Sequence, residues 1–156
     1  MQRIGVISDT HGFLDPRVHD VFTGVDRIVH AGDIGIGILE ELELIAPVRA
    51  VLGNNDHWDF DLPVAIRLEV EGVTFQVAHM ARHILPPPAS VTIHGHTHIA
   101  EVIRTREGLL VNPGSASRPR GGRGPSVALV EVAEGMVKNA RIVGLDSIGT
   151  ESTSSP

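Results

Sequence analysis

The segment Ile4-Gly5-Val6-Ile7-Ser8-Asp9-Thr10-His11 (residues 4–11) sets the pattern for the first third of the chain. Its apolar, β-branched start is typical of a strand buried on both faces. The polar residues Asp9 and His11 follow directly after that strand. The same arrangement recurs twice, after two further apolar runs at residues 27–30 and 48–52. The sequence therefore predicts three strands, each followed by polar side chains.

Two amphipathic segments separate these strands. Residues 13–22 carry apolar side chains at helical spacing, with Pro16 in the first turn, and Gly24 is expected to end that helix. Residues 37–46 show the same spacing, and Pro47 closes the segment. Strands that alternate with helices predict a parallel sheet with right-handed crossovers. Such sheets bind ligands beyond the carboxyl ends of their strands.

The pattern changes after Pro63, where helical spacing disappears. Glu71-Gly72 predicts a two-residue hairpin turn, and the run Pro86-Pro87-Pro88 ends any helix that begins near Ala81. We predict seven further strands that pair mostly antiparallel, at residues 64–70, 73–78, 91–94, 99–105, 109–111, 127–132 and 136–143.

The chain length suits one folded unit. A chain of 156 residues is enough for one hydrophobic core, and we expect a single domain over residues 1–146. Residues 120–125 (RGGRGP) predict an irregular loop. Residues 147–156, rich in Ser and Thr without an apolar pattern, predict a disordered tail.

Composition excludes several classes of site and partner. The formal net charge is −6, and only four Phe and one Trp are present, which argues against binding long nucleic acids. The absence of cysteine excludes disulfides and thiolate metal sites. The apolar run near the start is too short for a signal peptide, and no stretch is long enough for a membrane helix. We therefore expect a cytoplasmic protein without membrane contact.

Each polar pattern is weak when it stands alone. Asp9-x-His11 and Gly32-Asp33 occur often by chance, and either Asp is common in ordinary turns. His96-x-His98 is more specific, because residues two apart in an extended segment point to the same side and can reach one metal ion. An exposed hairpin face would have the same spacing.

The patterns become informative when they are taken in order along the chain. They run Asp9-x-His11, Gly32-Asp33, Gly53-Asn54-x-Asp56, His79 and Gly95-His96-x-His98, followed by Asn112-Pro113-Gly114-Ser115. This order resembles the calcineurin-like metallophosphoesterases over residues 3–143, and most closely their small bacterial and archaeal phosphodiesterase branch. The resemblance implies an α/β fold, an αββα sandwich of two mixed β-sheets flanked by helices.

The resemblance also implies a site for two divalent metal ions. One ion would be bound by Asp9, His11 and His98, and the other by Asn54, His79 and His96, with Asp33 bridging the two. These oxygen and imidazole ligands suit manganese first, with nickel, iron, cobalt or zinc as alternatives. Two such ions can activate a shared water as the nucleophile for phosphoester hydrolysis.

Two positions depart from the family pattern. Many members place a proton-donating His after the metal-binding Asn, whereas this chain has Asn55, which cannot deliver a proton at neutral pH. We place Asn55 and Asp56 as candidate catalytic residues and expect substrates with good leaving groups. Met80 stands where the family usually has Gly. His57, a nearby alternative proton donor, is interpreted as a surface residue.

The remaining predictions concern substrate contacts and the other histidines. Asn55 and the turn residues Gly114 and Ser115 are candidate phosphate contacts, as are Arg118 and Arg120. His30 and His94 are expected to hold metal ligands in place rather than to bind metal. The role of His83 stays open between the substrate rim and the plain surface.

The leading functional hypothesis is a phosphodiesterase that acts on a small phosphoester. The alternatives are a phosphomonoesterase, including a protein phosphatase, and a non-catalytic scaffold like the retromer subunit related to this branch. The complete set of proposed ligands favours an enzyme over a scaffold, and Asn55 favours diesters over monoesters. The sequence does not determine the oligomeric state or the physiological substrate.

Overall fold

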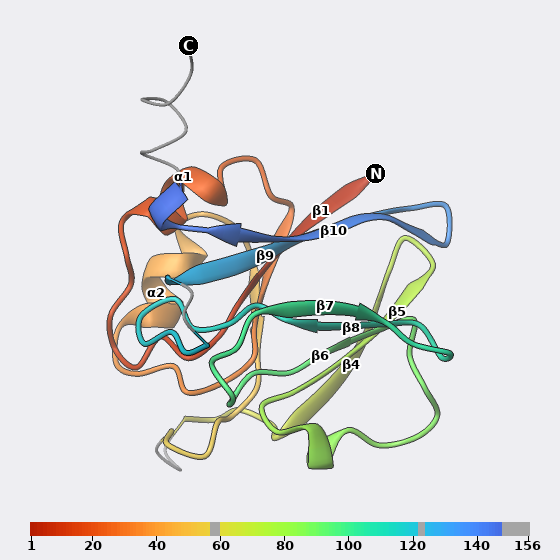
Figure 1. The fold of residues 1–156 in the computed structure, drawn as a ribbon, viewed down its shortest axis with the longest axis horizontal. Coiled ribbons are helices and arrows are strands. Elements are labelled where there is room, and N and C mark those ends of the chain that lie inside the picture. The colour runs from red at the N-terminus through yellow and green to blue at the C-terminus, as the bar shows by residue number, and fades with distance from the viewer. Residues whose placement is uncertain (57–59, 122–123, 148–156) are drawn as a thin grey trace.

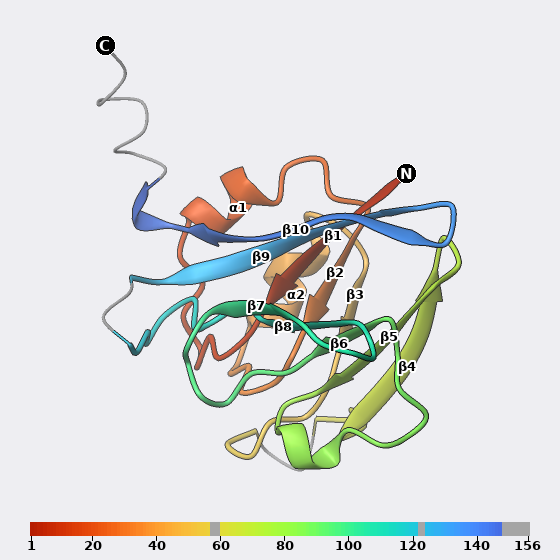
Figure 2. The ribbon, with the colours of Figure 1, turned by 45° about the vertical axis from the view of Figure 1, so that its right-hand side comes forward.

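Two five-stranded β-sheets pack face to face and make up most of the molecule (Figures 1 and 2). The computed structural model describes residues 1–56, 60–121 and 124–147. His57, part of the 120–125 loop and nearly all of the predicted tail lie outside the described residues. The two sheets confirm the predicted α/β sandwich of mixed β-sheets.

The first sheet has the strand order β10-β9-β1-β2-β3. Its parallel β1, β2 and β3 are the predicted opening strands, and β9 pairs antiparallel with the free side of β1. The strands of this sheet are β1 (Gln2–Ile7), β2 (Arg27–His30), β3 (Val48–Ala50), β9 (Ser126–Ala133) and β10 (Met136–Gly144).

Both α-helices are shorter than their sequence patterns predict. They are α1 (Arg17–Val21) and α2 (Ile38–Glu43). Pro16 forms the N-cap of α1, and the chain after Val21 tightens into a turn in which the Thr23 N–H donates to the Asp20 carbonyl at 3.3 Å. Apolar residues at helical spacing therefore lie both in the helices and in the turns beside them, because the turn residues also face the core.

The second sheet has the order β4-β5-β6-β8-β7 and combines predicted antiparallel pairs with parallel ones. Its middle strands β5, β6 and β8 are parallel, whereas β4 and β7 pair antiparallel at the edges. The 3-10 helix η1 (Ala81–His83) lies in the β5–β6 connection in place of an α-helix. The strands are β4 (Ala65–Val70), β5 (Val73–Ala78), β6 (Val91–Ile93), β7 (Glu101–Arg104) and β8 (Leu109–Asn112).

Two layers of apolar side chains hold the sandwich together. Ile4 and Val6 of β1 enter the core between the sheets, while Ile7 faces the helices together with Val18 and Phe22. This alternation follows from the two-residue period of a strand. Both helices thus cover the outer face of the first sheet. Within the described residues no helix is long and apolar enough to cross a membrane.

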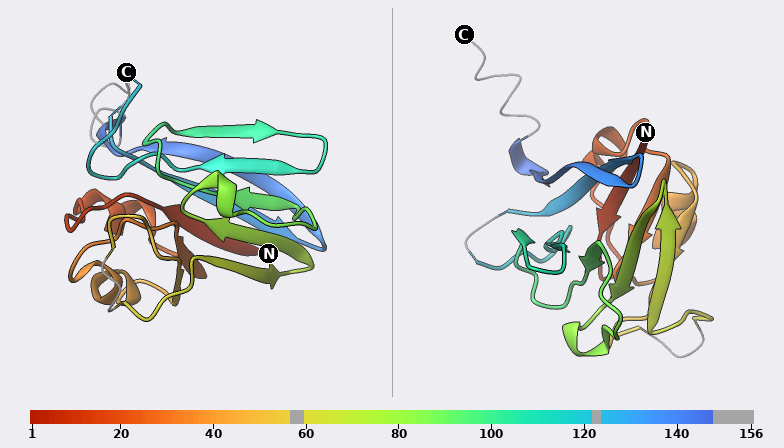
Figure 3. Two further views of the ribbon diagram at one scale, coloured as in Figure 1. Left: turned by 90° about the horizontal axis from the view of Figure 1, so that it is seen from below. Right: turned by 90° about the vertical axis from the view of Figure 1, so that its right-hand side faces the viewer.

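The two ends of the sandwich differ in what they carry. The turns of the β4–β5, β7–β8 and β9–β10 hairpins gather at one end, which we call the hairpin end (Figure 3, left). There the Gly135 N–H donates to the Glu71 carbonyl at 2.8 Å and joins the two sheets. The parallel strands of both sheets run toward the opposite end, so the segments after them meet there.

Candidate metal centre

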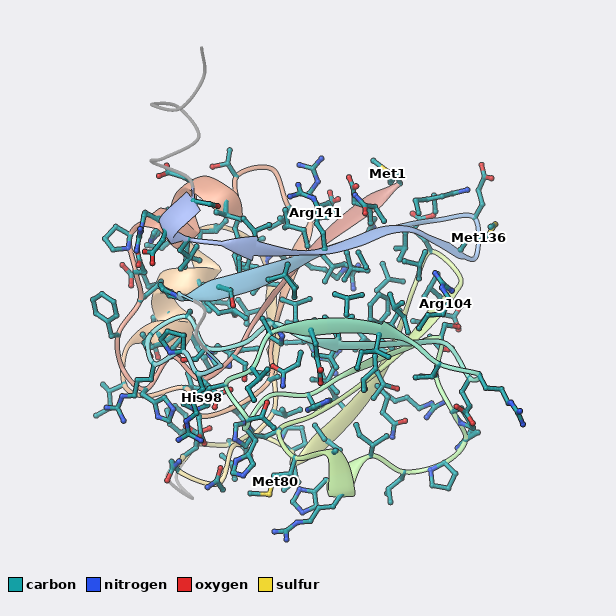
Figure 4. The ribbon with its side chains drawn as sticks, viewed as in Figure 1. Met1, Met80, His98, Arg104, Met136 and Arg141 are labelled. Carbon is teal, nitrogen blue, oxygen red and sulfur yellow. The ribbon has the colours of Figure 1, made fainter. Side chains whose placement is uncertain are left out.

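The parallel strands deliver the predicted ligands to one end of the sandwich, which we call the metal end. Asp9 and His11 follow β1, and Asp33 follows β2. His79 follows β5 in the other sheet, and the segment with His98 follows β6. In Figure 4 His98 and Met80, the neighbour of His79, lie at the metal end, away from Arg104 and Met136. The unpredicted parallel pairing in the second sheet is what brings His79 and His98 to the first.

One group of ligands, the His98 cluster, consists of Asp9, His11 and His98. Their ligand atoms all lie within 4.8 Å of one another. The His98 Nε2 atom is 3.2 Å from Asp9 Oδ1 and 3.4 Å from His11 Nε2. These are the three residues predicted for the first ion.

A second group, the His79 cluster, consists of Asp9, Asp33 and His79. The His79 Nε2 atom is 3.4 Å from Asp33 Oδ2 and 3.8 Å from Asp9 Oδ1. Because His11 Nε2 also lies 3.9 Å from Asp33 Oδ2, the two clusters adjoin. Asp9, assigned to one ion by the sequence, therefore belongs to both groups.

Hydrogen bonds fix the tautomers of two of these histidines. His79 Nδ1 donates to the Ala31 carbonyl at 2.8 Å, and His98 Nδ1 donates to the Arg118 carbonyl at 2.5 Å. In the neutral rings each Nε2 then carries a lone pair that faces the carboxylates. A backbone acceptor on the second nitrogen is the usual support of a metal-bound histidine.

The centre contains buried polar atoms that lack a protein partner. Asp9 Oδ1 and His79 Nε2 are buried and make no hydrogen bond in the described part of the chain. Leaving such atoms unpaired costs about 1–3 kcal/mol each, and both are acceptors when His79 is neutral. Acceptors that converge on one point fit a cation, so the residues present suit the divalent metal that the resemblance implies.

The ionisation of His79 and Asp33 agrees with a site for positive charge. Burial alone lowers the pKa of His79, but its contact with Asp33 and the charges of Asp9 and Asp33 outweigh burial and raise it. Burial tends to raise the pKa of Asp33, whereas His79 and two donors from Asn55 lower it well below its usual range. The Asp33 carboxylate thus stays ionised and attracts a cation.

Asp9 is oriented by contacts on both its side chain and its backbone. Its Oδ2 atom accepts from the Ser8 hydroxyl at 2.6 Å and from the His96 N–H at 3.1 Å, which leaves Oδ1 facing the clusters. Its carbonyl accepts from the hydroxyls of Ser115 at 2.7 Å and Ser117 at 3.0 Å. The ligand is therefore held rigidly before any ion binds.

Five proposed ligands adopt the left-handed backbone conformation that residues with side chains rarely enter. Each such residue costs roughly 1–2 kcal/mol, and strained residues of this kind concentrate at functional sites. The φ values are 55° for Asp9, 49° for His11, 57° for Asp33, 72° for His96 and 63° for His98.

A close backbone approach at Gly53 completes the frame of the centre. A Cβ atom on Gly53 would lie 2.1 Å from the Asp33 nitrogen and 2.2 Å from its Oδ1 atom. No side chain larger than hydrogen fits there. Gly53 thus lets the segment after β3 pass directly behind Asp33.

The comparison with known families decides the assignment. The model of the calcineurin-like phosphoesterase superfamily domain matches residues 2–135. The chain belongs to this superfamily. A probable metallophosphoesterase of Methanothermobacter thermautotrophicus is 37% identical over 135 residues, which cover 75% of this chain and 78% of the relative. The resemblance seen in the sequence is confirmed.

Solved structures show the same superfamily fold. A novel archaeal phosphodiesterase is 22% identical with a TM-score of 0.73, and the match covers 92% of this chain and 99% of that chain. The Vps29 protein of Entamoeba histolytica in complex with Zn²⁺ is 19% identical with a TM-score of 0.73, over 92% and 99% of the two chains. At these identities the likeness concerns the fold.

Two further predicted ligands of a metallophosphoesterase, His96 and Asn54, lie near the His79 cluster. The His96 ring is 5.2 Å from the His79 ring, centroid to centroid. Asn54 is exposed and lines a small cavity with His79 and Met80. Both residues border the His79 cluster, and their role as metal ligands stays a prediction.

The carboxylate of Asp56 is hydrogen-bonded to backbone N–H groups. It accepts N–H groups of Asp33 at 2.9 Å, Ile34 at 2.7 Å and Gly53 at 2.7 Å. These three bonds tie the segment after β3 to the segment after β2. The contacts favour a positioning role for Asp56 over the catalytic role predicted from its place in the superfamily motif.

The turn after β8 supports the centre through hydrogen bonds within the protein. Ser115 is fully buried and its hydroxyl donates to the Asp9 carbonyl. The Gly114 N–H donates to the Asn112 side chain at 2.9 Å. The Ser115 hydroxyl and the Gly114 N–H are thus used within the protein, and substrate contacts of these two residues stay a prediction. Arg118 and Arg120 do line the cavity at the metal end.

His30 anchors the two ligand-bearing segments of the first sheet. Its Nδ1 atom accepts the Gly32 N–H at 3.1 Å, and its Nε2 atom donates to the Thr10 hydroxyl at 3.0 Å. Complete burial, together with the charge on His79, lowers the pKa of His30 to about 3. His30 thus remains neutral and acts as the predicted support.

Several supporting residues were not identified from the sequence. Ser8, Thr10 and Ser117 each contact a segment distant in the chain, and a lone hydroxyl gives no periodic signal. His94 is buried with its Nδ1 atom 3.2 Å from the Gly95 carbonyl, outside both clusters. His83 lines the small cavity beside His79.

Proposed function

We propose that this chain is a dinuclear metal-dependent phosphodiesterase that hydrolyses small phosphodiesters. The observation that carries the proposal is the pair of unpaired buried acceptors, Asp9 Oδ1 and His79 Nε2, where two ligand clusters share Asp9. The related probable metallophosphoesterase and the archaeal phosphodiesterase of the same fold support it.

The ligand set suits hard to borderline divalent ions. We assign Asp9, His11 and His98 to one position and Asn54, His79 and His96 to the other, with Asp33, whose Oδ2 atom lies near both His11 and His79, shared between them. Manganese is the first expectation, because carboxylate, amide and imidazole ligands without thiolate give little preference for zinc. The chemistry that such ions supply is activation of water and neutralisation of phosphoryl charge.

Asn55 restricts the leaving groups that the site can expel. It occupies the position where many members of the superfamily have His, and its amide donates to Asp33 Oδ2 at 2.8 Å. An amide cannot release a proton to a departing alkoxide at neutral pH. Esters whose leaving group needs no proton are therefore the preferred substrates.

Arg118 and Arg120 supply the positive charge that an anionic substrate needs. Both line a cavity of about 370 Å³ that also exposes His11, Asp33 and His98. The protein carries a net charge of −6, so attraction of a phosphate has to be local. A cavity of this size accommodates a small ester rather than a polymer.

The direct test is metal-dependent turnover of an artificial diester. Protein stripped with chelator and reloaded with Mn²⁺ is assayed with bis(p-nitrophenyl) phosphate and with p-nitrophenyl phosphate. We expect hydrolysis of the diester that is lost on chelation and restored by Mn²⁺, with slower monoester turnover. Faster monoester turnover would favour a phosphomonoesterase.

A non-catalytic scaffold is the second candidate, favoured by the Vps29 fold likeness. Metal binding alone does not separate the two functions, because that Vps29 structure holds Zn²⁺. Binding of Mn²⁺ measured by calorimetry without turnover of either ester, across Mn²⁺, Ni²⁺, Co²⁺ and Zn²⁺, would replace the enzyme with the scaffold.

A further inference from the structure

Two neighbouring loops form one rim of the metal centre, and each leaves a large apolar side chain exposed. The loops are joined by the His11 N–H, which donates to the Asp33 carbonyl at 3.0 Å. Phe13, two residues after His11, is 55% exposed, and Ile36, three residues after Asp33, is 88% exposed. Apolar surface therefore lies beside the ligands on both loops.

Two glycines with left-handed backbone flank Ile36. Ile36 stands between Gly35 with φ 88° and Gly37 with φ 83°, a conformation that side chains disfavour. Gly35 packs against the backbone of Gly12, where an added Cβ would lie 2.1 Å from the Gly12 nitrogen, and Gly37 is the N-cap of α2. A single exposed isoleucine needs no explanation by itself, but this one also lines a cavity.

That cavity, of about 410 Å³, opens on the metal centre. Its lining consists of His11, Gly12, Asp33, Gly35, Ile36, Asn55, Asp56 and Arg118. Among the carboxylates of this lining, that of Asp56 already accepts three backbone N–H groups. The other cavity at the centre is basic, with Arg118 and Arg120.

The two cavities share His11, Asp33, Asn55 and Arg118, and they differ in that Arg120 lines one and Ile36 lines the other. One ester substituent then faces Arg120, and the other faces Ile36 and glycine backbone, with Arg118 in the lining of both cavities. An apolar substituent on the Ile36 side removes apolar surface from water on both partners. A small, polar ester substituent gains little binding free energy on the Ile36 side.

We propose that Ile36 is a specificity-determining residue that contacts an aromatic or alkyl ester substituent of the substrate. The substrate class is then a phosphodiester with at least one bulky apolar ester group. This inference rests on the proposed phosphodiesterase function, which it deepens by assigning a surface for the organic part of the ester.

Two symmetrical diesters test the proposal without regard to binding orientation. Diphenyl phosphate and dimethyl phosphate have poor leaving groups and serve as ligands. Calorimetry on the Mn²⁺-loaded protein gives the affinity for diphenyl phosphate. Inhibition of bis(p-nitrophenyl) phosphate hydrolysis gives an inhibition constant for diphenyl phosphate and one for dimethyl phosphate. We expect Ile36→Ala to weaken diphenyl phosphate roughly tenfold and to leave dimethyl phosphate unchanged.

Two further variants serve as controls. Leu44→Ala removes another apolar side chain, 83% exposed and outside both cavities, and should change neither constant. Ile36→Leu should restore the affinity for diphenyl phosphate. Equal weakening of both diesters, or no weakening, would overturn the role of Ile36 while the wild-type protein still hydrolyses bis(p-nitrophenyl) phosphate. If the wild-type protein neither binds nor hydrolyses diesters, the proposed function itself fails.

Discussion

The hairpin end and the metal end both contain residues with left-handed backbone, but different contacts hold these residues in place. At the hairpin end Glu71 and Glu134 are left-handed with φ values of 51° and 53°, and each precedes a left-handed glycine in a tight turn. At the metal end Asp9, His11 and Asp33 are left-handed too, but contacts from other segments hold them. At the hairpin end the left-handed conformation is required by a local turn. At the metal end it is strained, and contacts that form only in the complete fold hold it in place.

The largest effect is expected where one side chain serves both ligand clusters. Asp9→Asn keeps a residue type that tolerates left-handed backbone but removes the charge, so diester turnover should fall roughly 1000-fold or more. The metal-free protein should keep its stability, because the new amide can donate to His79 or His98. Activity is measured with saturating Mn²⁺, and stability by urea unfolding in chelator.

If Asp9→Asn instead unfolds the metal-free protein, the carboxylate supports the fold and the contrast between the ends disappears. Retained turnover would remove Asp9 from the metal centre.

The next effect compares one glycine at each end. Gly53→Ala places a Cβ atom against the Asp33 backbone, which should cost about 3 kcal/mol of unfolding free energy and most of the activity. Gly72→Ala, at the hairpin end, meets Gly135 at 3.1 Å and should cost roughly 1–2 kcal/mol through its φ of 77°. Gly72→Ala should leave turnover per folded molecule unchanged. Equal loss of activity in both variants would contradict the distinction.

The third effect is a dependence of stability on pH that arises at the metal end. His30 is neutral when folded, with a pKa near 3, but gains a proton near pH 6.5 when unfolded. The unfolded state therefore binds more protons between these values, and stability falls as pH decreases below 6.5. Between pH 6.5 and pH 5 the loss from this group is about 2 kcal/mol.

His30→Asn is the matched control for this effect. Asparagine can still accept the Gly32 N–H but does not titrate, so its unfolding free energy should depend less on pH in chelator. The raised pKa of His79 has the opposite sign, since it stabilises at low pH, but it is common to both proteins. Identical pH profiles for the two proteins would show that His30 is not held neutral.

The smallest effect concerns the hairpin turns themselves. Glu71→Asn replaces a left-handed glutamate with a residue that favours this conformation, and should stabilise the protein by up to about 1 kcal/mol. Turnover should not change. Thermal unfolding and the diester assay check both statements, and destabilisation would mean that the Glu71 side chain makes contacts beyond its turn.

Strands and turns could be predicted from the sequence because their signals are local. Val73–Ala78 and Arg27–His30 were predicted at their observed bounds, and Glu71-Gly72 forms the predicted turn. The parallel pairing of β5 with β6 was missed. Strand pairing depends on partners distant in sequence, and the short η1 connection gave no helical pattern between them.

The candidate site was predicted as a set of residues more completely than as an arrangement. The residues of both clusters were all identified, because their order follows the strand ends. The membership of Asp9 in both clusters and the engagement of Asp56 and Ser115 by backbone depend on angles and hydrogen bonds that residue type does not encode. A buried hydroxyl and a phosphate-binding hydroxyl look the same in a sequence.

The bond between His98 Nδ1 and the Arg118 carbonyl separates the support of a metal ligand from the recognition of the substrate. Because the acceptor is backbone, the side chain at position 118 can change while the support of His98 remains. Asp9 differs, because its carbonyl accepts from the side-chain hydroxyls of Ser115 and Ser117. Selectivity for the ester can therefore diverge by single substitutions along the cavity wall, without a compensating change among the metal ligands, which makes this centre readily evolvable toward new substrates.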